Sequence, residues 1–527
     1  MVMPNPHDLD TEPPRWVRDA VVYQIFPDRF ASSERVHWPG RLEPWDAPPT
    51  RYGFKGGDLL GVVEHLDHLT GLGVTAISLN PIFASASNHR YHTYDYRAVD
   101  PLLGGNAALR ELLDAAHDRG LRVILDGVFN HAGRGFWPFH HVLENGGASP
   151  YVDWFFLNPE WLKAGRRLRA YAETASAPGA AAAEWADPYA TGRESLARLG
   201  YRAWWDLPSL PKLNTDNPEV RAYLFESVEE WTRFGVDGWR LDVAGEIETP
   251  GFWEEFRQRV RAINPEAYIV AEHWEERPDL LDGRTFDALM NYTLLCATIG
   301  FAAGRHLDAR IVGQHAWLAR RIVPLDGPAF GARLEHLTAL YRPVARDAML
   351  NIVGSHDTPR VRTTAGGDLA AVRLAMLAQM TLPGAPCIYY GDEIGLAGEM
   401  DPGSRGAFPW SPAAWNRDLL EFAQATIRLR QRTPALSAGE LRVVGAIGSA
   451  VAYLRTGASP EAPPALVALN NGDDEVPLAC DLPIAANSLR SVSLPGLPPS
   501  PNAILARDGR LELVVPPRGG AVLVADA

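Results

Sequence analysis

The sequence predicts a (β/α)8 barrel with one large insertion after its third strand, followed by a β-sandwich. Three observations support this fold class. Eight short apolar runs, with helical stretches between them, lie between residues 20 and 390. The alternation lapses between residues 131 and 214, where the chain is rich in aromatic residues, Gly, Pro and Ala. After the barrel the chain changes to short alternating strands with many Pro and Gly. We therefore expect a barrel at 1–130 and 216–435, an inserted B domain at 131–215 and a sandwich at 436–527.

The first part of the barrel is predicted from three buried strands and the helices between them. AVVYQIF at 20–26 is apolar and β-branched, as strands of a parallel sheet are. GGDLLGVVEHLDHLTGLG has helical spacing and ends in Gly, and it precedes a strand at 74–79. A helix at 109–119 closes at Gly120 and leads to the strand 121–125. The later segment ETASAPGAAAAEWADP is interpreted as part of the insertion, because the pattern resumes after it.

The second part of the barrel repeats this alternation. A helix at 218–234 has Pro near its start, where the missing N–H costs little, and a strand at 238–243 follows it. The remaining strands are expected at 267–271, 286–291, 348–352 and 386–390, and the remaining helices at 252–263, 369–380 and 418–431.

Composition narrows the class of partners. The net charge of −14 comes without a strongly basic segment, which argues against nucleic acid and anionic membranes. No apolar run approaches the ~18 residues that span a bilayer. The N-terminal MVMPNPHDLDTEPPRW lacks the pattern of a secretory signal, and three distant cysteines fit a reducing compartment, so we expect a cytoplasmic protein. Many of the 16 Trp and 16 Tyr lie in loops, where aromatic rings pin the loop or stack on sugar rings.

Polar clusters follow four of the predicted strands. Catalytic groups of such barrels gather at the C-terminal ends of the strands. The stretches RVILDGVFNH, GWRLDV, YIVAEHW and MLNIVGSHD supply Asp126, Asn130 and His131; Arg240 and Asp242; Glu272; and His356 and Asp357. Burying several carboxylates together without a function would cost several kcal/mol of desolvation. The pattern therefore predicts an active site.

Two of these carboxylates suit different chemical roles. Arg240 and Asp242 are two residues apart in a strand, so their side chains share one side, and the guanidinium is expected to keep Asp242 ionised. For this pair alone, a surface or interdomain ion pair is the alternative. Glu272, close to Trp274, is expected to hold a proton. A nucleophilic carboxylate and a proton-donating carboxylate are the two groups that glycoside hydrolysis uses.

The same stretches resemble the four signature regions of the α-amylase family of retaining glycoside hydrolases, over residues 21–410. The resemblance implies the barrel, the B domain and the C-terminal sandwich. It implies that Asp242 is the nucleophile, Glu272 the acid/base and Asp357 the stabiliser of the transition state. It further implies a set of residues that bind the sugar at the cleavage site: Tyr91, stacking beneath it, with His131, Arg240, His356, His92 and Asp126.

LPKLN at 210–214 and FWPFHHVLENGGASPYVDWF are similar to the neopullulanase, cyclomaltodextrinase and maltogenic amylase branch. That branch usually has a β-rich N-terminal domain through which it dimerises, whereas this barrel is expected to start almost at once. We therefore expect a monomer, or a homodimer formed in another way. The family commonly has Tyr-Asp where this chain has Tyr91-His92, with His92 neutral or protonated and Asp95 a candidate to compensate.

No cofactor is expected to be required, and calcium is left open. The branch often binds calcium near its first barrel loop, but DRFASSERVHWPG lacks the needed oxygens and retains only Asp58 of GGDLLG downstream. Asn130 is a candidate for a different calcium site, or an amide that orders its loop. Trp204 and Trp205 are interpreted as a sugar platform or as core of the B domain.

We expect a retaining α-glycoside hydrolase that cleaves α-1,4 and possibly α-1,6 bonds of maltooligosaccharides, cyclodextrins or pullulan. An exo-acting α-glucosidase or a transglycosylase is the alternative within the enzymes. A non-catalytic homologue that binds sugar or a partner is the alternative of another class, and it would be expected to lack one of the three carboxylates.

Overall fold

The computed structural model describes residues 12–172, 194–459, 462–482, 489–498, 504–505 and 509–525. Eight parallel strands form a sheet in the order β8-β7-β6-β5-β2-β1-β10-β9, and a parallel bridge from Met290 to Leu350 joins its edges. The predicted barrel is confirmed. Its strands are β1 (Val22–Ile25), β2 (Ala76–Leu79), β5 (Arg122–Gly127), β6 (Gly238–Leu241), β7 (Tyr268–Ala271), β8 (Ala288–Leu289), β9 (Leu350–Ile352) and β10 (Ala385–Tyr389).

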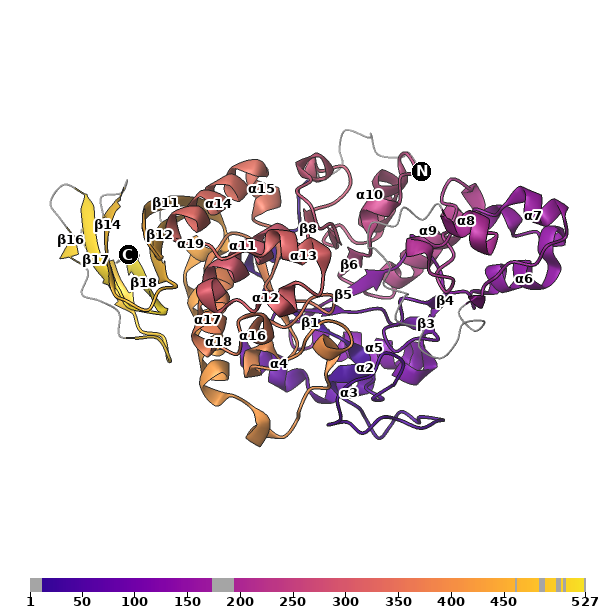
Figure 1. Ribbon diagram of the computed structural model, residues 1–527, viewed down its shortest axis with the longest axis horizontal. Helices are drawn as coiled ribbons and strands as arrows, with labels where there is room; N and C mark the ends of the chain where they lie inside the picture. Colours follow the sequence, from indigo (N-terminus) through magenta and orange to yellow (C-terminus); the bar gives the residue numbers. More distant parts are fainter. Residues whose placement is uncertain are drawn as a thin grey trace.

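Helices pack around the outside of the barrel (Figure 1). In α9, Asn217 accepts hydrogen bonds from the N–H groups of Glu219 and Val220, and Pro218 occupies the first turn. Each large apolar side chain that such a helix buries contributes roughly 1.5–3 kcal/mol. The helix expected in GGDLLGVVEHLDHLTGLG is two helices, because the chain departs from helical geometry at His65. The covering helices are α3 (Leu59–Glu64), α4 (Leu66–Leu72), α5 (Gly105–His117), α9 (Pro218–Arg233), α10 (Phe252–Ile263), α11 (Tyr292–Ala303), α14 (Gly327–Leu340), α17 (Leu369–Thr381) and α18 (Arg417–Arg432).

Two excursions rise from the C-terminal ends of the strands, which we call the catalytic face. One is the hairpin of β3 (Phe83–Ser85) and β4 (Thr93–Val99). The other follows β5 and holds α6 (Trp137–Asn145), α7 (Pro159–Lys163) and α8 (Glu194–Leu199), at the right of Figure 1. The stretch ETASAPGAAAAEWADP and residues 1–11 lie outside the described residues. Shorter helices are α1 (Trp16–Asp19), α2 (Pro27–Phe30), α12 (Ala309–Val312), α13 (Ala316–Arg321), α15 (Pro343–Arg346), α16 (Val361–Thr364) and α19 (Pro434–Ser437).

Two antiparallel sheets form the C-terminal part, at the left of Figure 1. They pack on each other through a separate apolar core that includes Leu466, Leu478 and Leu511, as a β-sandwich does. One sheet holds β11 (Gly439–Ile447), β12 (Ala450–Gly457), β13 (Ala465–Asn470), β18 (Gly519–Ala525) and β15 (Leu489–Val492), and the other β14 (Val476–Asp481), β17 (Arg510–Val515) and β16 (Ile504–Leu505).

Two buried arginines join this sandwich to the barrel. Arg430 of α18 donates to carbonyl oxygens at the end of α17, including Met380 O at 3.1 Å, and to Leu436 O of α19 at 2.9 Å. Arg455 of β12 donates to the same Leu436 O at 3.1 Å. Burial, and then the charge of Arg455, lower the pKa of Arg430 to about 9. Carbonyl oxygens at helix C-termini carry a partial negative charge, and this charge holds the two cations in the interior.

Within the described ranges, no helix combines the length and apolar character that crossing a bilayer requires.

Candidate active site

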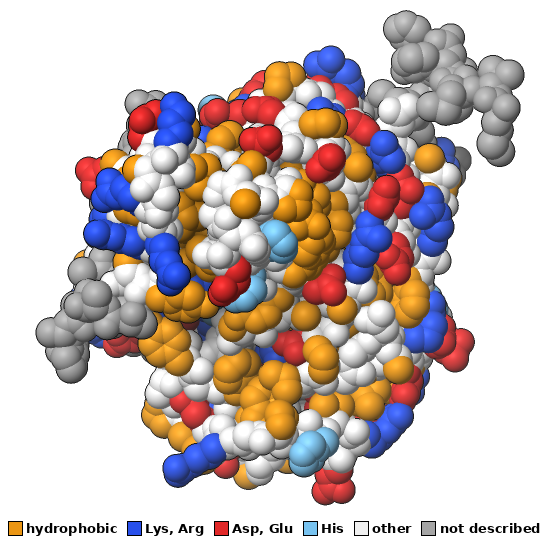
Figure 2. Space-filling view, turned by 90° about the vertical axis from the view of Figure 1, so that its right-hand side faces the viewer, with side chains coloured by type: hydrophobic (Ala, Val, Ile, Leu, Met, Phe, Trp, Pro, Cys, Tyr) orange, Lys and Arg blue, Asp and Glu red, His pale blue; other side chains and the backbone are white. Residues whose placement is uncertain are grey.

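Asp126 and Arg240 are partners in adjacent strands, because β5 pairs with β6 in a register that sets them side by side. Asp242 follows the end of β6, and Glu272 follows the end of β7. Neighbouring parallel strands end at one edge, so the side chains meet there. The strand predicted at 238–243 ends earlier, at Leu241. Figure 2 looks onto this side of the molecule, where hydrophobic side chains surround a hollow with acidic side chains in it.

A strained residue ends β6. Val243 has φ 38° and ψ 46°, a left-handed conformation that a β-branched side chain adopts only at a cost of roughly 1–3 kcal/mol. This turn aims the Val243 N–H at Glu272 Oε2, to which it donates at 2.9 Å. The strain therefore positions a backbone donor on one of the carboxylates.

Arg240 is fully buried and contacts three carboxylates. Its Nη1 donates to Asp126 Oδ1 at 2.9 Å and to Asp242 Oδ1 at 2.8 Å, and its Nη2 lies 2.9 Å from Glu272 Oε2. If all three carboxylates were ionised, the group would carry a net charge of −2 in a buried site. The three carboxylates gathered on one cation therefore oppose one another's ionisation.

Burial is the main influence on these carboxylates. It raises the pKa of Asp126 to about 6, although the charge of Arg240 and hydrogen bonds from Arg240 and Tyr91 counteract it. Burial also raises the pKa of Asp242 well above its ordinary value, against Arg240 and with the help of Glu272 and Asp126. The sequence predicted that Arg240 keeps Asp242 ionised. In the structure one guanidinium is divided among three carboxylates, so Arg240 offsets the effect of burial on the pKa of Asp242 only in part.

Glu272 has both carboxylate oxygens engaged and Asp242 has one free. Trp274 Nε1 donates to Glu272 Oε1 at 2.8 Å, and the Trp274 ring stacks on Tyr292 with centroids 4.2 Å apart. Asp242 Oδ1 accepts from Arg240, whereas its buried Oδ2 has no hydrogen-bond partner among the described residues. Buried polar atoms without partners are rare, so such an atom in a cleft indicates a place where a ligand binds.

Tyr91 joins the carboxylates to the histidine that follows β9. Its hydroxyl donates to Asp126 Oδ2 at 2.9 Å and lies 2.7 Å from His356 Nε2. The Tyr91 and His356 rings are parallel, with centroids 5.4 Å apart. His356 Nε2 also lies 3.0 Å from Asp357 Oδ2, and Asp357 is the most exposed of the three predicted catalytic carboxylates, at 28%. The four predicted strand ends therefore meet around Tyr91 and Arg240.

His131 and His92 are neutral groups. Burial lowers the pKa of His131 to about 3 and that of His92 to about 4, so neither is protonated at neutral pH. The ring of His131 stacks on Trp204 at 4.8 Å, and Trp205 stacks on Trp204 at 4.4 Å. His131 Nε2 is buried and has no hydrogen-bond partner in the part of the chain that the structure describes. His92 packs edge-on against His89 at 4.8 Å. Of the two states that the sequence left open for His92, burial favours the neutral one.

The two candidate calcium ligands do not fit a calcium ion. Asn130 Oδ1 accepts from Lys212 Nζ at 2.5 Å, and the same ammonium donates to Glu246 O at 2.7 Å. A side-chain cation therefore already satisfies that oxygen. Asp58 caps α3, with Oδ1 accepting from the Gly61 N–H at 2.7 Å and Oδ2 from the Ser33 N–H at 2.8 Å. In the part of the chain that the structure describes, no cluster of three or more His, Cys, Asp or Glu could hold a metal.

Arg405 was not predicted. Its Nε donates to His356 O at 2.9 Å, and its Nη2 donates to Asp357 Oδ1 at 3.3 Å. It follows β10 in the Gly-rich stretch PGSRGAF, and the sequence carries no signal that directs this loop back to Asp357.

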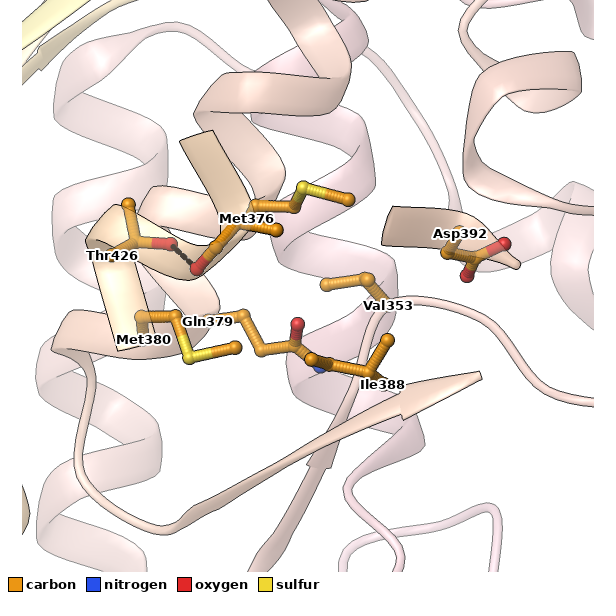
Figure 3. A pocket seen from close by; sticks show the side chains of 8 residues that line it. Val353, Met376, Gln379, Met380, Ile388, Asp392 and Thr426 are labelled. Carbon is orange, nitrogen blue, oxygen red and sulfur yellow. Dashed lines mark hydrogen bonds between the residues drawn. The ribbon is translucent and has the colours of Figure 1, made fainter. Parts of the chain in front are cut away.

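A separate internal cavity of about 10 Å³, between β10 and helices α17 and α18, is lined by Met376, Met380 and Ile388 and is too apolar and small for a sugar (Figure 3).

A closed parallel barrel with buried carboxylates at the C-terminal ends of its strands is the arrangement of a barrel enzyme, and paired carboxylates are the groups that glycoside hydrolases use. The family model for the alpha amylase catalytic domain matches residues 24–438. The chain belongs to the alpha-amylase family and is a glycoside hydrolase of that family.

Named relatives cover most of the chain. A cyclomaltodextrinase of Bacillus sp is 40% identical over 480 residues, which are 90% of this chain and 76% of that protein. Neopullulanase 2 of Thermoactinomyces vulgaris is 38% identical over 97% of this chain and 78% of its own. The structure of a debranching enzyme of Nostoc punctiforme superimposes with a TM-score of 0.82 at 42% identity, covering 98% of this chain and 99% of that one.

Proposed function

We propose that the protein is a retaining α-glycoside hydrolase in which Asp242 is the nucleophile. The observation that carries this role is the division of its carboxylate: Oδ1 is held by Arg240, and the buried Oδ2 has no hydrogen-bond partner within the described ranges. Oδ2 forms a bond to the anomeric carbon while the bond from that carbon to the leaving oxygen breaks. Glu272 gives its proton to the leaving oxygen. Water then attacks the same carbon, Glu272 takes a proton from it, and Asp242 is released as a carboxylate.

The other predicted residues hold the sugar or the carboxylates. Tyr91 forms the platform beneath the sugar, and His131 Nε2, which no described residue hydrogen-bonds, binds one of its hydroxyls. Arg240 and Asp126 are buried beneath the site and organise its charges, which refines the sugar-binding role that the sequence implied. Asp357, partly exposed and held by His356 and Arg405, stabilises the positive charge that develops on the sugar ring.

The proposed substrates are maltooligosaccharides, cyclodextrins and pullulan, with cleavage of α-1,4 and also α-1,6 bonds. The named relatives support this range, since they comprise a cyclomaltodextrinase, a neopullulanase and a debranching enzyme. Products of maltotriose, cyclodextrin and pullulan, separated by chromatography, test it. Opening of the cyclodextrin ring supports an endo-acting cleft. Release of glucose alone from chain ends would instead indicate an α-glucosidase, and products longer than the substrate a transglycosylase.

The catalytic assignment is tested by Asp242→Asn and Glu272→Gln. Both variants are expected to lose nearly all turnover and still bind maltotriose, because each keeps the shape and loses only the charge or the proton. Substantial hydrolysis by either purified variant would refute the assignment.

We further propose a cytoplasmic location and action without a required cofactor. The three cysteines, all free and buried, support a reducing compartment. The oligomeric state stays a prediction: a monomer or a homodimer.

A further inference from the structure

Residues 304–326, which connect α11 to α14, return to the catalytic face and are tied there to two loops. Trp317 Nε1 donates to Glu275 Oε1 at 2.7 Å, in the loop after β7. Gln314 Nε2 donates to Glu399 Oε2 at 2.7 Å, in the loop after β10. The segment 304–326 therefore bridges two loops at the rim of the cleft, and helices α12 and α13 within it are held on that rim.

His315 stands between these two anchors. Its ring centroid lies 5.2 Å from that of Trp274, at an interplanar angle of 32°. Neither of its ring nitrogens has a hydrogen-bond partner among the described residues, and Nδ1 is buried. Two histidines elsewhere on the surface do have partners: His336 Nε2 lies 2.8 Å from Glu276 Oε2, and His141 Nδ1 lies 2.9 Å from Ser149 Oγ. His315 thus keeps its hydrogen-bonding capacity unused beside the cleft.

The charged group that acts on His315 is Asp357, yet burial prevails and lowers the pKa of the imidazole. A neutral imidazole offers one donor and one acceptor, which match a sugar hydroxyl. His315 also lies on a definite side of the site. Trp274, against which it packs, donates to Glu272, the proposed proton donor to the leaving oxygen. The sugar that carries that oxygen is therefore next to Trp274.

We infer that His315 is a specificity-determining residue that hydrogen-bonds a hydroxyl of the glucosyl unit on the leaving side of the scissile bond. This inference rests on the proposed function, because Glu272 defines the leaving side. The segment 304–326 then serves as a wall of the leaving-group subsite, and its anchors hold the imidazole at a fixed height above Trp274.

Two substrates that differ only in the leaving group test the role. Maltotriose places a sugar on the leaving side, whereas α-maltosyl fluoride releases fluoride, which has no hydroxyl to bind. His315→Ala is expected to lower kcat/KM for maltotriose about tenfold, the loss of one hydrogen bond, and to leave α-maltosyl fluoride within about twofold. His315→Phe, which keeps a ring against Trp274 but no nitrogen, is expected to behave like the Ala variant. Ala319→Ser, at an exposed position of α13, is the matched control and is expected to change neither rate.

Three outcomes with the His315 variants would overturn the inference. An equal fall on both substrates would mean that His315 acts through Trp274 on the proton donor. No change on either substrate would mean that His315 makes no contact with sugar. Full activity of His315→Phe on maltotriose would mean that ring packing, not hydrogen bonding, is what matters. Wild-type protein that hydrolyses neither substrate would refute the proposed function itself, and the inference with it.

Discussion

Replacement of Arg240 by Met is expected to destabilise the protein strongly and in a pH-dependent way. The guanidinium contacts Asp126, Asp242 and Glu272 at 2.8–2.9 Å, and all of these groups are buried. Removing one partner of a buried ion pair costs about 3–5 kcal/mol, because the remaining charge stays in the interior. With an unfolding entropy of about 1.1 kcal/mol per kelvin for a chain of this length, that cost lowers the melting temperature by roughly 3–5 °C.

The pH dependence follows from the raised pKa values in this cluster. At pH 5 the folded Arg240→Met variant can keep Asp126 and Asp242 protonated, so the missing cation matters less. At pH 8 the same carboxylates are driven to ionise without a counter-charge. We therefore expect the melting temperature, measured by calorimetry, to fall at least twice as far at pH 8 as at pH 5.

Arg257→Met is the matched control. Arg257 donates to Asp287 Oδ1 at 2.7 Å, but Arg261 also holds Asp287, at 2.9 Å, so the carboxylate keeps a partner when Arg257 is lost. This variant is expected to lose less stability and to lose it equally at both pH values. A fall for Arg240→Met that is independent of pH, or no larger than that of the control, would refute the reasoning about a shared guanidinium.

Three further predictions concern Asp126, Lys212 and the two candidate calcium ligands. The pKa of Asp126 is raised from 3.8 to about 6, so between these pH values the folded protein keeps a proton that the unfolded chain has released. The stability of the fold therefore falls by about 3 kcal/mol as pH rises through this range. Asp126→Asn is expected to flatten this part of the melting-temperature profile, and an unchanged slope would contradict the assignment. Burial lowers the pKa of Lys212 to about 8, so between pH 8 and 10.5 the unfolded chain holds a proton that the folded protein lacks, and the stability of the fold rises with pH. Lys212→Met is expected to abolish this rise. It is also expected to lower the melting temperature at pH 7 relative to wild-type protein measured alongside, because Asn130 Oδ1 loses its donor. Treatment with a strong calcium chelator is expected to leave the melting temperature unchanged, since Asn130 and Asp58 already bond to protein donors; a clear fall, reversed by added calcium, would show that calcium binds elsewhere in the chain.

The barrel was predictable because its signals are local. Each buried strand is a short apolar run, and the helix expected at 252–263 has the same bounds in the structure. The stretch between residues 292 and 346 carried no such signal. There α11 is apolar on all sides, because it packs between neighbouring helices, so no amphipathic stripe marks it. The hairpin of β3 and β4 was likewise not expected, since its residues are too mixed to read as strands.

The candidate site was predictable as a list of residues and not as a charge arrangement. Alternation along β6 correctly set Arg240 and Asp242 on one side. That Arg240 also reaches Glu272 depends on the neighbouring strand, and that Val243 donates to Glu272 depends on a left-handed turn. Arg405 and His315 arrive from loops distant in sequence. Their contacts follow from the closure of the barrel, which no local pattern encodes.

The buried arginines at the junction with the C-terminal sandwich have a consequence for how the chain can be divided. Arg430 belongs to the helix that closes the barrel, yet its acceptor Leu436 O is shared with Arg455 of the sandwich. Cutting the chain between α19 and β11 would take away the second donor and open the carbonyls to water, while Arg430 would remain among them. We therefore expect barrel and sandwich to unfold as one cooperative unit. A catalytic fragment that ends at residue 438, where the family match ends, would lack part of the contacts that stabilise it.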